Sequence, residues 1–456
     1  MQSRIENNLT QGNIFTKLVL FAVPFLASNL VQSFYNVADM LIVGNFVGMV
    51  SMSGVNIGGQ VTFILTNVVI GLAMGATVLI GQYVGSGNRM ALERVTATII
   101  TLLLILSAAI TVPMLVFKRP LLAFIKTPAE AFAESDVYLT VTLIGIVFIF
   151  GYNALSAILR GMGNSRQPFY FVLIACITNV LLDLLFVAVF HWAAFGAALA
   201  TVVSQALSTV LCIIYMVRNR FHFDFKISSF RIYGDQFANI LRIGLPTCAQ
   251  NAVTSLSFLF LTALVNLFGV SASAAVGAVG KFNSFAFMPV MAISASISAV
   301  AAQNIGAGKL GRAVDACRIG TAFSTILMWL FFLGVQLFPE PILAIFSRDA
   351  EMIQDGVTYL RSFSFDFLII PFVFCIGGFL IGGGHTLFTL VTSMLSAVVL
   401  RIPACWIFGI VLGKGLFGVG LGAPIASAGT LLLVTGYMLS GRWKVNAALP
   451  EQAHVL

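Results

Sequence analysis

Asp39 is a carboxylate inside a long apolar stretch, Ile14 to Gly48, and it is the first candidate for chemistry in this sequence. Three amides precede it, at spacings that put four polar side chains on one stripe of a helix: Asn29, Gln32, Asn36 and Asp39. A charged side chain near the bilayer centre costs about 2.5–3.5 kcal/mol, so it should face protein or water rather than lipid. We interpret Asp39 as an ion or proton site that opens on a polar cavity. The alternative is a helix end at the membrane interface, where an aspartate would be ordinary.

Asp183 is a second acid in an apolar stretch. It follows Asn179 by four residues in the segment CITNVLLDLLF, so these two side chains share one helical face. Two carboxylates in one apolar site are not both stable as anions, so two such acids brought together would take up a proton from an acidic outside and release it to a neutral cytoplasm. Alternatively, the oxygens of such a site would surround a hard cation such as sodium. The residue types do not choose between these two possibilities.

The composition is that of an integral membrane protein. Of 456 residues, 59% are hydrophobic and only 9% are charged, whereas soluble domains carry about 25% charged residues. The net charge of +8 comes from basic residues scattered in short loops, which fits membrane topology better than nucleic-acid binding. The six cysteines form no metal-ligand or CxxC spacing, so we expect no disulfide, no metal and no cofactor. The first 13 residues are polar and resemble no cleavable signal, so we expect the first helix to be retained.

Apolar runs of transmembrane length recur along the chain and predict an all-α membrane fold with twelve transmembrane helices. The expected spans are 15–47, 54–84, 95–117, 136–158, 167–190, 193–217, 238–267, 274–303, 316–338, 356–381, 386–412 and 416–440. An even number of spans leaves both termini on one side. Sixteen Lys and Arg residues fall on that side and six on the other, so the positive-inside rule predicts cytoplasmic termini.

The chain divides into two halves that repeat each other. Residues 1–217 form an expected N-lobe, 218–237 a basic cytoplasmic linker, 238–440 a C-lobe and 441–456 a cytoplasmic tail. Pro24 recurs as Pro246, a shift of 222, and the segment GQYVGSGN at 81–88 recurs as AQNIGAGK at 302–309, a shift of 221. Because each half has an even number of spans, the two pseudo-symmetric halves should be related by an axis along the membrane normal.

These features together resemble the multidrug and toxic compound extrusion (MATE) family of transporters. The resemblance rests on the two six-helix halves, the helix-1 proline followed by an aspartate, and the GQxxGxGN-type end of helix 2. It implies a V-shaped bundle of two lobes that exports organic compounds by alternating access, against an inward flow of protons or sodium ions. It also implies that the family's N-lobe cation site falls on Asp39, Asn179, Asp183 and Thr201. The helix-1 proline whose bending accompanies protonation in some members falls on Pro24.

The second half departs from the sodium-coupled NorM branch of that family. Thr254 stands where that branch has a glutamate, and Ile370 where it has an aspartate. At the repeat shift of 222, Asn179 and Asp183 correspond to Arg401 and Cys405. The chain is therefore more similar to the DinF-like branch with an N-lobe cation site, and we expect coupling in the N-lobe only.

Substrate contacts are harder to predict, because polar residues in spans also serve helix packing. The candidates for a substrate cavity are Asn36, Gln60, Asn153, Lys281, Met288 and Arg401. From the resemblance we expect a cation-coupled antiporter for lipophilic, often cationic, organic compounds, which acts as a monomer in membrane lipid. The alternative is a flippase for a lipid-linked precursor, which shares this architecture. We find no nucleophile–base pair and no metal cluster, so we do not expect an enzyme.

Overall fold

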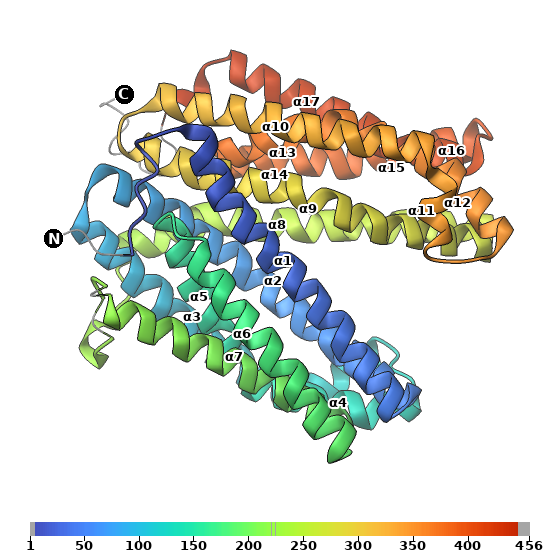
Figure 1. Cartoon of the computed structure of the whole chain (residues 1–456), viewed down its shortest axis with the longest axis horizontal. Helices are drawn as coiled ribbons and strands as arrows, with labels where there is room; N and C mark the ends of the chain where they lie inside the picture. The colour runs from blue at the N-terminus through green and yellow to red at the C-terminus, as the bar shows by residue number, and fades with distance from the viewer. Residues whose placement is uncertain (1–4, 220, 224, 446–456) are drawn as a thin grey trace. The chain divides into compact units, whose positions relative to one another are not determined.

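The computed structural model describes residues 5–219, 221–223 and 225–445, and all regular secondary structure in these ranges is helical (Figure 1). Two compact units share the chain, and helices α1 and α8 each run through both of them. The N unit consists of residues 5–8 and 23–244, and the C unit of residues 9–22 and 245–445. The expected lobes, 1–217 and 238–440, differ from these units. The expected division placed the whole of α1 in the N-lobe and nearly all of α8 in the C-lobe, whereas each helix belongs partly to both units. The predicted tail lies mostly outside the described residues.

The described residues of the first half form seven α-helices. They are α1 (Ile14–Phe46), α2 (Met49–Ser86), α3 (Arg89–Phe124), α4 (Ala129–Ile144), α5 (Ile146–Gly161), α6 (Arg166–Asp183), which continues as the π-helix η1 (Leu184–Val189), and α7 (Ala193–Arg218), followed by the 3-10 turn η2 (Ile227–Ser229).

The described part of the second half is divided into more elements. It contains α8 (Gly234–Val265), η3 (Asn266–Phe268), α9 (Val270–Gly306), α10 (Leu310–Leu337), α11 (Pro339–Ala344), α12 (Ala350–Phe363), α13 (Asp366–Gly382), α14 (Thr386–Met394), η4 (Leu395–Arg401), α15 (Ile402–Trp406), η5 (Ile407–Val411), α16 (Gly415–Gly420), α17 (Gly422–Leu439) and η6 (Arg442–Lys444).

The helices confirm the predicted all-helical membrane fold. Among the described residues, ten continuous helices are long and apolar enough to cross a membrane, and two bent pairs make twelve if each pair is one span. The helices extend beyond several predicted spans, because an apolar run stops at the first charge whereas a helix continues through it. The bends of 50° between α4 and α5 and 51° between α12 and α13 were not predicted. Gly145 lies at the first bend, and a Cβ there would collide with Val202 of α7.

Matching backbone conformations confirm the internal repeat. Three pairs of glycines separated by 221 residues share a positive φ, which side chains other than glycine rarely tolerate. The φ angles are 103° and 105° at Gly48 and Gly269, 70° at both Gly87 and Gly308, and 80° and 82° at Gly163 and Gly384. Each pair ends or begins equivalent helices, so the two halves of the chain turn in the same way.

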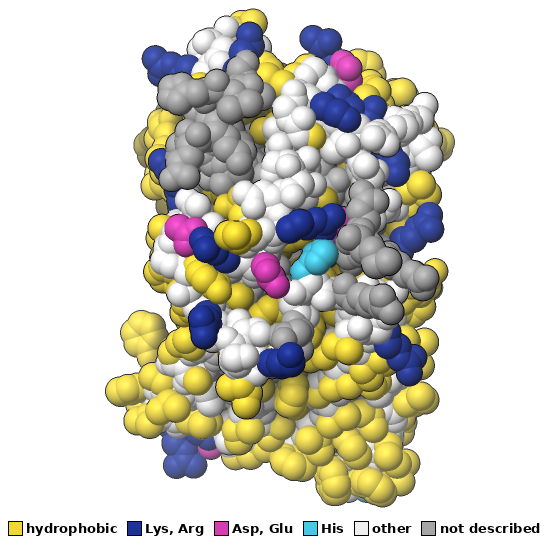
Figure 2. Space-filling view, turned by 90° about the vertical axis from the view of Figure 1, so that its left-hand side faces the viewer, with side chains coloured by type: hydrophobic (Ala, Val, Ile, Leu, Met, Phe, Trp, Pro, Cys, Tyr) yellow, Lys and Arg dark blue, Asp and Glu magenta, His cyan; other side chains and the backbone are white. Residues whose placement is uncertain are grey.

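Apolar side chains cover much of the surface, as expected for helices in lipid. Phe34, Val37 and Leu41 of α1 are more than half exposed, and so are Ile177 and Leu181 of α6. In Figure 2, Lys and Arg side chains are scattered over one face among such apolar groups. Exposed apolar area on this scale is typical of a surface that faces lipid rather than water.

Candidate functional site

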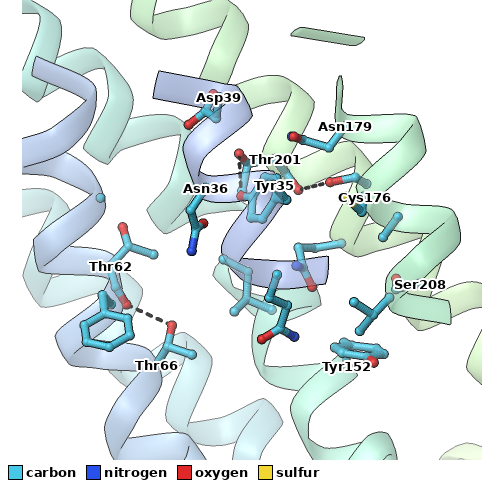
Figure 3. A pocket seen from close by; sticks show the side chains of 18 of the residues that line it. Tyr35, Asn36, Asp39, Thr62, Thr66, Tyr152, Cys176, Asn179, Thr201 and Ser208 are labelled. Carbon is cyan, nitrogen blue, oxygen red and sulfur yellow. Dashed lines mark hydrogen bonds between the residues drawn. The ribbon is translucent and has the colours of Figure 1, made fainter. Parts of the chain in front are cut away.

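A cavity of about 430 Å³ lies within the N unit, between α1, α2, α4, α5, α6 and α7 (Figure 3). Its wall combines apolar residues with polar side chains, including Asp39, Asn179 and Thr201. We call it the N-unit cavity. These three polar residues are far apart in the sequence, on α1, α6 and α7. They meet here because the three helices pack around the same cavity. A few polar groups converging in an apolar pocket are typical of ligand sites.

Asp39 and Asp183 are in direct contact. Their carboxyl groups lie within hydrogen-bonding reach of each other. Both residues are buried, with exposed fractions of 7% for Asp39 and 0% for Asp183. Among the described residues, no hydrogen-bond donor reaches Oδ1 of either carboxyl group. Two ionised carboxylates offer only acceptors, so this contact is stable only when a proton or a cation lies with the pair.

Asn179 and Thr201 complete the group predicted from the resemblance. In the amide orientation that satisfies both of its ends, Asn179 donates from nitrogen to Asp183 Oδ2 at 2.9 Å and accepts at oxygen from the Thr201 backbone N–H at 3.2 Å. Asp183 is the last residue of α6, directly before the π-helical turn η1. Such wide turns often accompany functional sites. The structure thus brings together all four residues that the resemblance implied.

Two tyrosines that the sequence analysis did not select also belong to this group. Tyr35 lies one helical turn before Asp39, and its hydroxyl is 3.3 Å from Thr201 Oγ1. The Tyr138 hydroxyl is a second hydrogen-bonding neighbour of the Thr201 side chain. Gly58 fits the Tyr138 ring, because a Cβ at that glycine would lie 2.6 Å from the Tyr138 Cδ1 atom. Tyr35 could have been selected from the sequence, because it lies four residues before Asp39 and so on the same face of the helix.

Three of the six predicted substrate residues line the N-unit cavity: Asn36, Gln60 and Asn153. Asn36 lies on the same helix as Asp39, one turn earlier (Figure 3). Gln60 donates to Asn56 Oδ1 at 3.3 Å, and Asn153 donates to the Ile149 carbonyl at 2.8 Å. These three amides therefore add polar groups to the cavity wall, besides Asp39, Asn179 and Thr201.

The other three predicted substrate residues are elsewhere. Lys281, Met288 and Arg401 belong to the C unit and do not line the N-unit cavity. The guanidinium of Arg401 lies 5.2 Å from the centre of the Phe258 ring instead of in an open site. Arg401 forms no ion pair within 4.0 Å with Asp366, a buried acid of the same unit that hydrogen-bonds the Ser427 side chain. Hydropathy could not assign these residues to a helix face, because every face of such helices is largely apolar.

Pro24 lies at the point where α1 passes from the C unit to the N unit. The C-unit part of the helix ends at residue 22 and the N-unit part begins at 23. Pro246 of α8 has the equivalent place, next to the boundary at 244 and 245. A proline removes one hydrogen bond of the helix ladder and so provides a weak point for bending. The Ser28 hydroxyl donates to the Pro24 carbonyl at 2.8 Å.

Comparison with known proteins agrees with the repeat and the fold. The MatE family model matches the chain twice, at residues 24–185 and 246–407. A probable multidrug resistance protein of Bacillus subtilis, YpnP, is 27% identical over 98% of this chain and 99% of its own length. A second one from the same organism, YoeA, is 28% identical over 95% of both chains.

A solved structure shares the fold. The crystal structure of a MATE protein in the bent conformation matches with a TM-score of 0.89 at 22% identity, over 98% of each chain. The two family matches together cover more than half of the sequence, and they contain Asp39, Asn179 and Asp183. The chain is a multi-pass membrane protein that belongs to the MatE family, whose members are transporters and not enzymes.

Proposed function

We propose that this chain is a proton-coupled antiporter that exports lipophilic, often cationic, organic compounds, drugs among them, by alternating access. The observation that carries this proposal is the contact between two buried carboxyl groups, that of Asp39 on the wall of an organic-sized cavity and that of Asp183 behind it. The multidrug resistance names of the two Bacillus subtilis relatives support the substrate class.

The geometry of the pair favours a proton over sodium as the coupling ion. A proton between two carboxyl oxygens supplies the donor that the contact lacks. A sodium ion would need several oxygen ligands directed at one point. In the amide orientation that satisfies both of its ends, Asn179 already donates to Asp183 without any ion.

Loss of the proton would change the charge of the cavity wall by one unit. The deprotonated pair would attract an organic cation, and reprotonation from the outside would weaken that attraction and favour release. Exchange of one proton for one monovalent cation moves no net charge, so it runs on the pH gradient alone, about 1.4 kcal/mol per pH unit. Each additional charge that crosses 100 mV adds about 2.3 kcal/mol.

We further propose that coupling is confined to the N unit, as in the DinF-like branch. The counterpart of Asp39 at the repeat shift is Leu261, and the counterpart of Asp183 is Cys405. The chain would act as a monomer in a bacterial inner membrane, with both termini in the cytoplasm, since the basic residues are concentrated in the loops on that side. The flippase alternative is not favoured, because the relatives are drug-resistance transporters.

Dye efflux from proteoliposomes tests this function. Purified protein is reconstituted, loaded with ethidium, and given either a proton gradient or a sodium gradient of equal size. Transport is expected with the proton gradient alone, and it should disappear in Asp39→Asn. Transport driven by sodium at constant pH would contradict the proposed coupling ion, and wild-type transport rates in Asp39→Asn would contradict the coupling role of this residue.

A further inference from the structure

A second cavity, of about 330 Å³, lies within the C unit between α8, α9 and α12. Ten of its thirteen lining residues are the repeat counterparts, at a shift of 221 or 222, of residues that line the N-unit cavity. Tyr359, for example, corresponds to Tyr138, and Gly280 to Gly59. We call it the C-unit cavity. The internal repeat has therefore placed a cavity against equivalent helices in each unit, α1, α2 and α4 in the N unit and α8, α9 and α12 in the C unit.

The polar groups of the N-unit cavity are replaced in this second copy. Leu261 stands in the place of Asp39, and Phe258 in that of Asn36. The counterparts of the remaining coupling residues Asn179, Asp183 and Thr201 are Arg401, Cys405 and Ala423. Among the described residues, no carboxylate, lysine, arginine or histidine lines the C-unit cavity. The C-unit cavity thus lies against equivalent helices but lacks the ionisable side chain that lines the N-unit cavity.

One polar group in the C-unit cavity lacks a partner. Asn283 lines the cavity with an exposed fraction of 7%, and no donor among the described residues reaches its Oδ1 atom. Its counterpart in the N unit, Thr62, is 3.3 Å from Thr142, whereas the residue at the place of Thr142 in the C unit is Phe363. A buried acceptor without a donor is costly, so a ligand that donates an N–H or O–H here would gain a hydrogen bond.

Aromatic rings form much of the remaining wall. Phe287 and Phe363 have ring centres 6.4 Å apart, and Tyr359 lies 5.8 Å from Phe363. Rings at such separations provide faces and edges for another aromatic ring. The fixed positive charge of Arg401 lies against Phe258, which is itself part of the wall. This charge opposes entry of an organic cation, because the apolar surroundings screen it weakly.

We propose that the C-unit cavity is a second binding site, which takes an uncharged aromatic compound, or the uncharged aromatic part of one, that donates a hydrogen bond to Asn283. The two cavities then have different roles: the N-unit cavity binds the coupling ion, and the C-unit cavity binds a neutral aromatic ring. The inference deepens the proposed function by naming a substrate class. Binding itself, however, does not require that transport be proton-coupled.

The test is a fluorescence titration of the purified full chain in detergent with 7-hydroxy-4-methylcoumarin at pH 6, where this probe is neutral. Asn283→Leu, which removes the acceptor and keeps an apolar side chain, should raise the Kd about tenfold through the lost hydrogen bond. Phe258→Ala should also weaken binding, whereas Phe260→Ala, on the same helix but outside the cavity wall, should not. An unchanged Kd in both Asn283→Leu and Phe258→Ala, with wild-type melting temperatures, would overturn the proposal.

A second pair of variants separates this inference from the proposed function. Asp39→Asn, in the other unit, should leave the coumarin Kd unchanged even though proton-driven efflux is lost. Leu261→Asp should weaken binding of the neutral probe and create binding of ethidium in the C unit, detected as a second ethidium site in Asp39→Asn protein. Coumarin binding that depends on Asp39 but not on Asn283 would assign the probe to the N-unit cavity and contradict the inference.

Discussion

The carboxyl group of Asp39 on α1 contacts that of Asp183 at the end of α6, although the two residues are far apart in the sequence. Each has one buried oxygen that no donor among the described residues reaches. A proton shared between the two carboxyl groups would therefore stabilise the pair.

Replacement of the second acid should be as damaging as replacement of the first. In Asp183→Asn the pair no longer needs a proton, because the new amide can itself donate to Asp39. We expect proton-driven dye efflux from everted vesicles to fall at least about tenfold, the value of one charge-assisted hydrogen bond. Efflux with a normal pH dependence would show that Asp39 acts without Asp183.

The hydroxyl of Tyr35 should contribute through Thr201. Its removal in Tyr35→Phe loses one hydrogen bond, which we expect to slow efflux about fivefold while the protein remains folded. Tyr170→Phe is the matched control, because that tyrosine is 51% exposed and does not line the cavity. Equal efflux rates in the two variants would exclude a role for the Tyr35 hydroxyl.

The close fit between Gly58 and Tyr138 should make this glycine intolerant of a side chain. Gly58→Ala places a Cβ 2.6 Å from the Tyr138 ring, so the ring must move, at a cost of about 1–3 kcal/mol. Gly59→Ala is the neighbouring control, since its Cβ would lie 4.0 Å from the Tyr138 hydroxyl, an ordinary contact. The melting temperature in detergent should fall for the first variant only, and a similar fall for both would show that the contact with Tyr138 is not the cause.

Pro24 should matter for transport more than for folding. Alanine at this position restores a helix donor and improves helix propensity by up to about 3 kcal/mol, so Pro24→Ala should stabilise a straight α1. We expect an unchanged or higher melting temperature with slower efflux. Pro113→Ala, inside α3 and within one unit, serves as the control. If both variants transport at the wild-type rate, bending at Pro24 is not part of the cycle.

The candidate site was more predictable than its surroundings. Asp39 and Asp183 stand out because charges are rare in apolar runs, and the spacing of Asn179 to Asp183 fixes a shared helical face. Tyr138 could not be selected from the sequence alone, since its contact with Thr201 depends on the packing of α4 against α2 and α7. The bend at Gly145 also could not be predicted from the sequence. The space that this glycine leaves is filled by Val202, which is 57 residues later in the chain.

Lys281 and Arg401 were harder to place from the sequence. Both were expected in a substrate cavity because a charge in an apolar span suggests function. Arg401 lies against the Phe258 ring, which is part of the C-unit cavity wall, and Lys281 is exposed. Sequence gives the presence of such charges but not the direction in which their side chains point.

Proton release on substrate binding tests the central claim most directly. Purified protein in weakly buffered detergent solution, with a pH indicator dye, is mixed with ethidium, and the protons released per bound ethidium are counted. The wild type should release protons when the cation binds, because the two cannot occupy the Asp39–Asp183 pair together, and Asp39→Asn should release none. Ethidium binding without proton release by the wild type, or equal release by Asp39→Asn, would contradict the account.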